Sequence, residues 1–245
     1  MYLGVDLGTS SVKLVLADAG GKIIDSASAD YPLYLPEEGW SEQKPEEWYA
    51  AVLDCVRKLG ERQDMSAVEG ISFCGQMHGL VVLDADDNVI RPAILWNDNR
   101  TTEECAYLNE EVGREKLLEW TGNVAFTGFT APKLMWLKKH EPDNFAKIAK
   151  IMLPKDYIAY KISGVFGSDV SDDSGTLYFD VKNRRWSASM LDLIGISEAQ
   201  LPAIFESTDV IGTVSPAFAA ESGMSTSAKV IIGGGDQAVG AVGTG

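Results

Sequence analysis

Two glycine-rich turns near opposite ends of the chain constrain its fold most, because each holds an aspartate at the end of an apolar strand. Asp6 lies in residues 4–11, which read GVDLGTSS, and Asp236 follows residues 231–235, which read IIGGG. A carboxylate at the end of a buried strand, followed by turn amides and hydroxyls, suits a site for metal and phosphate. Two such carboxylates predict phosphoryl transfer, with one aspartate for magnesium and the other for proton removal.

The balance of charges narrows the class of partner. The chain has 21 Lys and Arg residues against 36 Asp and Glu residues, and its formal net charge is −15. Binding to nucleic acid requires basic patches that neutralise phosphates, so nucleic acid is not expected as the main partner. Small anionic substrates stay compatible with this charge because a local cleft can differ from the surface as a whole.

Cysteine usage and hydropathy indicate the compartment. Cys55, Cys74 and Cys105 are odd in number and have no Cys-x-x-Cys spacing, so neither a disulfide framework nor a cysteine metal site is expected. A reducing cytoplasm fits this pattern best. The first residues are expected to enter a strand directly, without a basic and apolar leader. No apolar run approaches the roughly 18 residues that span a bilayer, so no membrane partner is expected.

The order of expected elements gives the fold class. Strands are expected at residues 2–6, 12–16, 22–31, 68–74, 80–83 and 229–232. Helices are expected at residues 45–60, 132–140 and 238–242. A further helix is expected to begin at a capping box formed by Thr101 and Glu104. The small residues of the last helix are expected to let it pack closely. Residues 169–180 are expected to form a loop or hairpin. Three early antiparallel strands followed by strand–helix alternation predict an α/β chain with a mixed sheet flanked by helices. Periodicity alone leaves open which mixed α/β topology this is.

The first turn offers groups for phosphate. Gly8 permits close approach of the backbone, while Thr9 and Ser10 carry amides and hydroxyls that can meet phosphate oxygens. Asp6, which precedes them, can hold magnesium or its bound water. A plain hairpin turn with a structural aspartate is the alternative for this segment.

Two further segments offer groups for a polyol. Gly75 and Gly79 bracket Met77 and His78 on a short loop, where the imidazole can donate to or accept from a hydroxyl. Trp96 follows another apolar strand, and its indole can pack against the apolar face of a sugar. The alternatives are a histidine satisfied by a nearby carbonyl and a tryptophan buried in the core.

The second glycine turn favours a catalytic carboxylate. The glycines of residues 233–235 let the chain turn sharply and bring Asp236 against a substrate, and Gln237 follows as a candidate sugar ligand. A flexible glycine hinge with an exposed aspartate is the alternative.

These motifs together resemble those of the FGGY carbohydrate kinases. The segments that carry the resemblance are MYLGVDLGTS at residues 1–10, CGQMHG at 74–79, AILWND at 93–98 and GGGDQ at 233–237. The resemblance implies a ribonuclease H-like (actin-like ATPase) fold. It also implies that residues 1–245 are the N-terminal, sugar-binding lobe and that the C-terminal nucleotide-binding lobe is absent from this chain.

The resemblance also implies an activity, with ATP and Mg²⁺ as its cofactors. It is closest to members that convert D-xylulose to D-xylulose 5-phosphate. The resemblance implies that Asp236 is the general base and that Asp6 holds magnesium. It also implies that Gly8, Thr9 and Ser10 contact phosphate. The residues that it implies to contact the sugar are Met77, His78, Trp96, Asp236 and Gln237. The lobe alone is expected to be inactive, and a homodimer is left open as its assembly.

Three alternatives stay open at this stage. The first is an FGGY kinase for another ketose, a polyol or an aldonate, since Gln237 stands where some D-xylulose kinases carry Asn. The second is a non-catalytic sugar-binding module built on the same lobe. The third is an actin-like or chaperone ATPase, which shares the Asp-x-Gly-Thr motif but gives no reason for residues 76–79.

Overall fold

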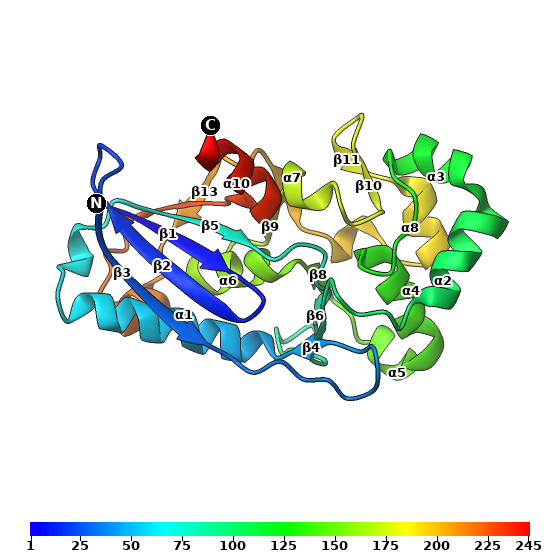
Figure 1. Cartoon of the computed structure of the whole chain (residues 1–245), viewed down its shortest axis with the longest axis horizontal. Coiled ribbons are helices and arrows are strands. Elements are labelled where there is room, and N and C mark those ends of the chain that lie inside the picture. Colours follow the sequence, from blue (N-terminus) through cyan, green and yellow to red (C-terminus); the bar gives the residue numbers. More distant parts are fainter.

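The fold is built on one mixed sheet, which fills one end of an elongated molecule, while helices fill the other end (Figure 1). The computed structural model describes residues 1–245. The strand order in the sheet is β13-β14-β5-β1-β2-β3, and β15 pairs with β5. Its strands are β1 (Tyr2–Leu7), β2 (Ser11–Ala17), β3 (Ile23–Asp30), β5 (Gly70–Gly75), β13 (Val210–Thr213), β14 (Lys229–Ile231) and β15 (Gly234–Gly235).

Alternating side chains explain why the first three strands form an antiparallel meander. Leu3, Val5 and Leu7 of β1 are buried, whereas the residues between them face outward. Strand β2 repeats this alternation, and β1 then pairs in parallel with β5. One apolar face and one open face result, as the period of two requires. Three antiparallel strands joined to parallel ones make the expected ribonuclease H-like mixed sheet.

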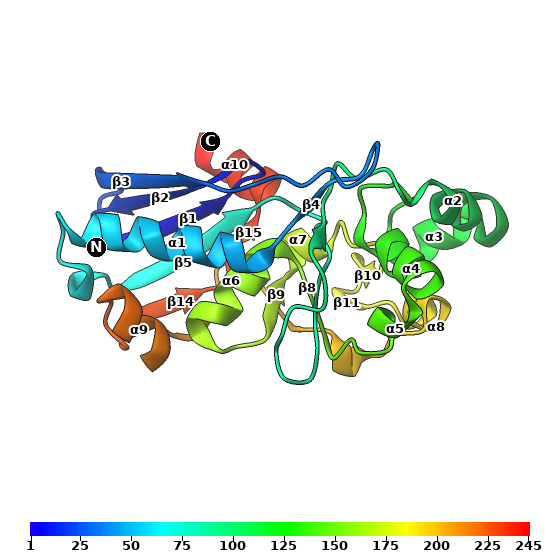
Figure 2. The ribbon, with the colours of Figure 1, turned by 90° about the horizontal axis from the view of Figure 1, so that it is seen from below.

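Helices cover the apolar face of the sheet. They are α1 (Pro45–Gly60), α6 (Pro154–Ser163) and α9 (Pro216–Ser222). Figure 2 shows these three side by side beneath the strands, with α10 (Asp236–Thr244) on the opposite face. Pro45 occupies the first helical turn of α1, and Trp48, Val52, Cys55, Val56 and Leu59 are all buried, as their spacing predicted.

The far half of the molecule has its own apolar core. Its helices are α2 (Thr102–Ala106), a π-helix (Tyr107–Gly113), α3 (Arg114–Thr121), α4 (Thr130–His140), α5 (Pro142–Phe145) and α8 (Ala188–Ile194). Short strand pairs join the halves: β4 (Glu42–Gln43) with β7 (Ala93–Ile94), β6 (Val81–Leu83) with β8 (Lys150–Met152), and β9 (Gly167–Asp169) with β12 (Ala203–Phe205). The 22 residues of this core include Leu80, Leu134 and Trp186.

One local expectation is wrong and another is only partly right. Thr101 is the N-cap position of α2, but its side chain makes no capping hydrogen bond and instead donates to the Thr127 carbonyl. Residues 169–180 are only partly a hairpin: β10 (Phe179–Asp180) pairs with β11 (Arg185–Trp186), but α7 (Val170–Asp173) precedes it as a buried helical turn. Asp169 caps that turn by accepting from the Ser171 amide, so its carboxylate makes a helix out of a polar stretch.

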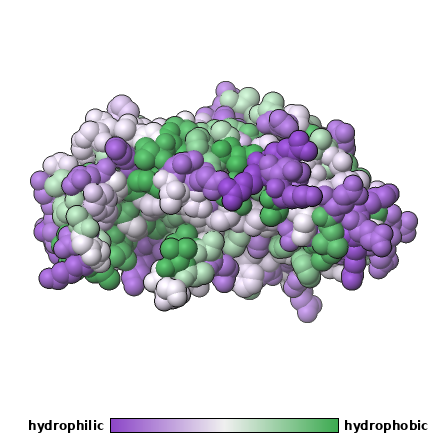
Figure 3. Space-filling model, turned by 90° about the horizontal axis from the view of Figure 1, so that it is seen from above, coloured by the Kyte–Doolittle hydropathy of each residue, from purple (hydrophilic) through white to green (hydrophobic).

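The surface differs between the two ends of the molecule. Seen from above, apolar patches lie over the middle of the molecule, and hydrophilic side chains predominate at the helical end (Figure 3). Helix α10 was expected to pack closely, and this expectation is wrong, because it buries none of its residues and Val242 is 85% exposed. No helix combines the length and the apolar character needed to cross a membrane.

Candidate functional site

Three parallel strands end side by side, and their ends bring the sequence motifs together. Leu7 of β1 and Gly235 of β15 are both paired with Gly75 of β5. The chain therefore leaves the sheet three times at the same end of the strands, at Gly8, at Gln76 and at Asp236. Ligands of open α/β sheets bind outside the carboxyl ends of parallel strands, which is the edge found here.

A cavity of about 170 Å³ lies at this edge. Its lining consists of six residues: Thr9, Met77, His78, Trp96, Asp236 and Gln237. The five residues expected to contact a sugar are thus neighbours in space, together with one residue expected to contact phosphate. Gly8 and Ser10 flank Thr9 in the adjoining turn, and Ser10 is exposed. The chemical roles of all these residues stay predictions.

Asp236 opens helix α10 and is half-buried in the cavity wall. Burial raises the pKa of its carboxyl above the ordinary value, and the charge of Asp6 adds to the rise, while hydrogen bonds from Gln237 oppose it. A raised pKa makes a carboxylate a stronger base, which is the property that proton removal from a hydroxyl requires.

Two glycines before Asp236 lie in close contact with neighbouring atoms. Gly233 has a φ of +74°, and a Cβ there would lie 1.8 Å from the Phe73 carbonyl oxygen. A Cβ on Gly235 would lie 2.9 Å from both Sδ and Cε of Met77. The glycine turn therefore brings the chain against β5 and leaves room for the thioether in the cavity.

His78 is fixed by its backbone and by its ring. Its φ of 67° is left-handed, and its carbonyl accepts from Lys133 Nζ at 2.7 Å and from Thr130 Oγ1 at 3.2 Å. The imidazole packs against Gly175 and lies 4.8 Å from the ring of Phe129. Burial and the nearby Lys133 lower the pKa of His78 to about 4, and Nδ1 has no partner. The ring is therefore neutral at pH 7, and its unpaired Nδ1 is buried on the side of the ring that faces Gly175.

Trp96 is part of the cavity wall and not of the core. Its side chain is 47% exposed, which excludes the buried-core alternative. The indole N–H donates to Thr9 Oγ1 at 3.0 Å. This bond joins the loop after β7 to the turn after β1, and it leaves the hydroxyl hydrogen of Thr9 free to donate elsewhere.

Gln43 is a site residue that sequence reasoning missed. It is fully buried, and its Nε2 donates to the Thr9 carbonyl at 2.7 Å, while its Oε1 accepts from Trp48 and Gln76 at 3.0 Å each. Gln43 thus fixes the turn after β1 at Thr9. No local signal marks it, because Thr9 and Gln76 are distant from it in the sequence.

Lys133 is a second residue that sequence reasoning missed. It is fully buried and donates to two carbonyls, those of His78 and Gly128, at 2.7 Å each. Burial lowers the pKa of this lysine to about 7. Since a Cβ on Gly128 would lie 2.6 Å from the Trp96 carbonyl oxygen, Lys133 links the histidine loop to the segment beside Trp96. A buried lysine on the apolar face of a helix was the available signal.

Asp6 does not line the cavity of Asp236. It is exposed on the open face of the sheet, beside an adjoining cavity of about 250 Å³ that Lys13, Cys74 and Val239 also line. No group of three or more metal-ligating side chains is present in the chain. A single exposed carboxylate fits magnesium that is held mainly by phosphate and water oxygens, which is how Mg²⁺ is commonly bound in kinases.

Asp98, the last residue of the motif at 93–98, is structural. It is fully buried, accepts from the Ser41 amide at 2.6 Å and pairs with Arg100 at 2.7 Å. The Arg100 guanidinium stacks 3.7 Å from the ring of Trp40. This group anchors the loop that carries Trp96 and leaves no carboxylate oxygen for a substrate.

A family profile and individual relatives both match this chain over nearly its whole length. The family profile described as "FGGY family of carbohydrate kinases, N-terminal domain" matches residues 1–243. The xylulose kinase of Escherichia coli K12 is 43% identical over 245 residues, which are 100% of this chain and 50% of that protein. The chain thus spans about half the length of the curated relatives it matches.

Solved structures agree with the sequence comparison. The xylulose kinase from Rhodospirillum rubrum superposes with a TM-score of 0.95 at 28% identity, over 99% of this chain and 50% of that one. The gluconate kinase from Lactobacillus acidophilus gives a TM-score of 0.91 at 29% identity, over 96% of this chain and 48% of that one. The family profile matches nearly the whole chain, and the solved kinases share its fold. The chain therefore belongs to the FGGY family of carbohydrate kinases.

Proposed function

We propose that the gene product carrying this chain transfers the γ-phosphoryl group of ATP to the terminal hydroxyl of D-xylulose, giving D-xylulose 5-phosphate and ADP. The chain would supply the sugar-binding lobe and the catalytic base. The observation that carries the proposal is the cavity in which Asp236 lies beside Met77, His78, Trp96 and Gln237. The name xylulose kinase of the E. coli relative supports this choice of sugar.

Asp236 has the chemistry of the base in this reaction. A sugar hydroxyl is a poor nucleophile at neutral pH, and its proton must leave as the bond to phosphorus forms. The half-buried carboxylate of Asp236, with its raised pKa, would accept that proton. It sits at the start of a helix and after three glycines, so a substrate can approach without meeting side chains of the turn.

The rest of the cavity suits a neutral sugar. Trp96 offers its ring face, because its N–H is already donated to Thr9. His78 is neutral at pH 7, and Gln237 carries an uncharged amide with both donors and acceptors. None of the six lining residues is Lys or Arg. An aldonate would meet the Asp236 carboxylate without a compensating cation, so a ketose or polyol is favoured over gluconate.

The phosphate groups would lie at the turn after β1. Gly8, Thr9 and Ser10 present amides and hydroxyls there, and Asp6 would hold Mg²⁺ or a water bound to it. When bound, the metal neutralises charge on the phosphate oxygens. All three cysteines are free, which fits a reaction that takes place in the cytoplasm.

A substrate panel tests the proposal. The complete purified gene product is incubated with ATP, Mg²⁺ and D-xylulose, D-ribulose, glycerol or gluconate, and ADP release is followed. We expect the highest kcat/KM with D-xylulose and a product phosphorylated at its terminal oxygen by mass spectrometry and NMR. Turnover only with gluconate or glycerol would show that this compound, and not D-xylulose, is the substrate. Saturable sugar binding without ADP release would favour a non-catalytic binding module.

A further inference from the structure

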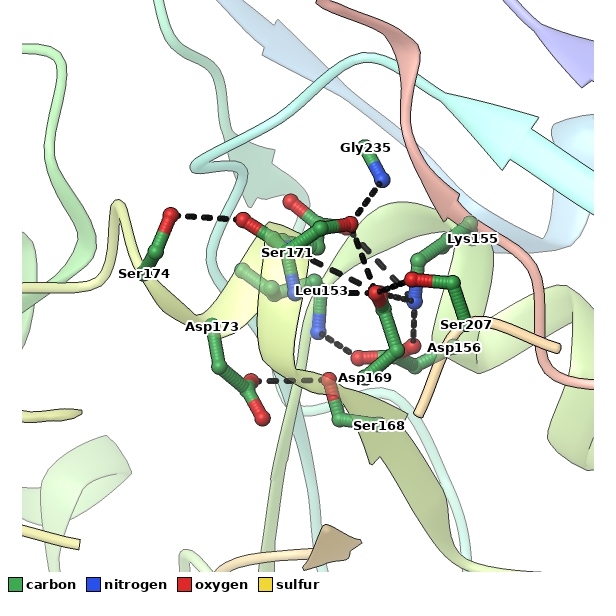
Figure 4. Close-up of polar contacts among 11 residues, drawn as sticks. Leu153, Lys155, Asp156, Ser168, Asp169, Ser171, Asp173, Ser174, Ser207 and Gly235 are labelled. Atoms are coloured by element: carbon green, nitrogen blue, oxygen red, sulfur yellow. Dashed lines mark hydrogen bonds and ion pairs between the residues drawn. The ribbon is translucent and has the colours of Figure 1, made fainter. Parts of the chain in front are cut away.

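A buried polar cluster lies behind the catalytic cavity. It consists of Lys155 and Asp156 at the start of α6, Asp169 at the end of β9, and Asp172 and Asp173 of α7. Figure 4 labels Lys155, Asp156, Asp169 and Asp173. All five side chains are buried, with exposures of 1% or less. None of them lines the cavity of Asp236. A charged cluster of this kind is costly to bury, so its contacts with neighbouring segments are informative.

Lys155 pairs with two carboxylates, those of its sequence neighbour Asp156 and of Asp169. Lys155 Nζ lies 2.9 Å from Asp169 Oδ1. Burial alone would raise the pKa of Asp169, but the lysine charge and the hydroxyls of Ser171 and Ser207 outweigh it and lower the pKa. Burial raises the pKa of Asp172 and Asp173 well above the usual range of a carboxyl. Asp169 therefore stays ionised and acts only as an acceptor.

The other oxygen of Asp169 connects to the glycine turn by two routes. Ser171 Oγ and Ser207 Oγ each donate to Asp169 Oδ2 at 2.6 Å. The Gly235 amide donates to Ser171 Oγ at 3.2 Å, and the Gly233 amide donates to the Ser207 carbonyl at 3.2 Å. Both ends of the turn are thus held by serines that share one carboxylate oxygen (Figure 4 draws the Ser171 route).

The direction of the Ser171 hydrogen bonds is fixed by chemistry. An ionised carboxylate cannot donate, so the hydroxyl hydrogen of Ser171 must point to Asp169. The lone pairs of the hydroxyl oxygen are then free to accept from Gly235. Because the next residue after Gly235 is Asp236, this bond restrains the backbone from which the proposed base extends.

We infer that Asp169 and Ser171 are positioning residues for Asp236, and that Lys155 keeps Asp169 in place as the acceptor. The inference rests on the proposed function, because it concerns the base of that reaction. Neither residue touches the cavity, so the effect passes through the glycine turn. A displacement of a catalytic group by about 1 Å can lower a rate by roughly 100-fold.

Ser171→Ala tests the inference, with Ser174→Ala as the matched control. Ser174 is also half-buried at the end of α7, but its hydroxyl donates to the Ser171 carbonyl and does not meet the glycine turn. In the complete gene product we expect Ser171→Ala to lower kcat by about 10- to 100-fold while the dissociation constant of D-xylulose changes less than threefold. Ser174→Ala should change kcat less than twofold.

Hydrogen exchange gives a readout that does not depend on turnover. In Ser171→Ala the amides of residues 233–237 should exchange at least about tenfold faster than in the wild type, and in Ser174→Ala they should not. If the wild-type enzyme phosphorylates no sugar of the panel, the proposed function fails, and the exchange rates still decide whether the turn is held by Ser171.

Three results would overturn the inference. One is a kcat in Ser171→Ala that equals that of Ser174→Ala. Another is an equal loss of kcat and sugar affinity, which would indicate collapse of the cavity. The third is unchanged exchange at residues 233–237. If Ser171→Ala does not fold, Ser171→Cys is measured against the same criteria, because its thiol keeps the size but is a weak acceptor.

Discussion

His78 illustrates how single residues set the properties of the cavity. Its left-handed backbone and the two donors to its carbonyl fix the loop, while its ring is pressed against Gly175. The imidazole is buried enough to be neutral at pH 7, although it lies beside a cavity lined by Asp236. Because Nδ1 is buried against Gly175, the neutral ring can form a hydrogen bond with a sugar hydroxyl only through Nε2.

His78 should make stability depend on pH in the acidic range. Its pKa is about 4 in the folded state and near 6.5 in the unfolded state, so between these values only the unfolded state binds the proton. Stability should therefore rise with pH from about 4 to 6.5, by no more than about 1.4 kcal/mol per pH unit. His78→Asn, which tolerates the left-handed backbone, should flatten this rise in urea unfolding at pH 5 and pH 7.

His140→Asn is the control for this measurement, because His140 is the only other histidine and lies exposed at the end of α4. It should leave the difference in unfolding free energy between pH 5 and pH 7 close to that of the wild type. An unchanged difference in His78→Asn would show that His78 titrates normally in the folded state.

At the scale of elements, the glycine turn joins β14 to α10 and has different tolerances at its two ends. Gly233 needs a positive φ and lies against the backbone of β5. Gly235 lies against the flexible end of Met77, which can move. Gly240, inside α10, has open space around its Cβ position. Alanine substitutions at these three positions therefore distinguish the effect of backbone strain from the effect of a smaller cavity.

Gly233→Ala should destabilise the fold by at least about 3 kcal/mol, because strain at positive φ and a clash with a carbonyl oxygen add together. Gly235→Ala should leave unfolding nearly unchanged but raise the KM for sugar, since Met77 must shift into the cavity. Gly240→Ala should stabilise α10 slightly, as Gly to Ala does within helices. Thermal or urea unfolding checks all three, and equal stabilities of the first two variants would contradict this reading of the turn.

Helix α4 depends on Lys133 for its contact with the histidine loop. Lys133→Met keeps the length of the side chain but leaves the carbonyls of His78 and Gly128 without this donor. We expect a loss of about 1–3 kcal/mol in unfolding free energy and a larger rise in the KM for sugar than in the KM for ATP. Equal rises in both constants would indicate a general structural defect and contradict a specific link to the sugar loop.

Local patterns predicted the elements better than the contacts between them. The alternation in residues 2–16 and the proline at position 45 were sufficient for β1, β2 and α1, because these signals act over a few residues. Gln43 and Asp169 could not be predicted, because their partners come from segments that meet only in the folded chain. The Thr101 capping box failed because Thr127, distant in the sequence, takes the hydroxyl.

At the scale of the whole molecule, the chain consists of a sheet half and a helical half, each with its own apolar core. The loop after β7 carries Trp96, and α4 carries Thr130 and Lys133, which donate to the His78 carbonyl. Asp6 lies in β1 of the sheet, and Asp236 begins α10 directly after β15. The open face of the sheet, with Asp6 and the exposed helix α10, lies beside the proposed phosphate turn. These exposed groups suit contact with a nucleotide and with further protein surface.

Residues 1–245 alone should therefore fold and bind sugar but fail to turn over. D-xylulose should raise the unfolding temperature of this chain, because a ligand that binds the folded state stabilises it. With ATP, Mg²⁺ and D-xylulose, ADP release should stay at background, since the FGGY relatives are about twice as long and this chain holds only the proposed phosphate turn. Turnover equal to that of the complete gene product would refute this expectation.

The most direct measurement is the kcat of Asp236→Asn in the complete gene product with D-xylulose and ATP. Asn keeps the size of the side chain and can still form hydrogen bonds, so the variant removes basicity without leaving a cavity. Positioned general bases contribute roughly 10²–10⁴-fold, so kcat should fall at least about 100-fold while the dissociation constant of D-xylulose changes little. A near-normal kcat would contradict the role of Asp236 as the base and leave it a binding or turn residue.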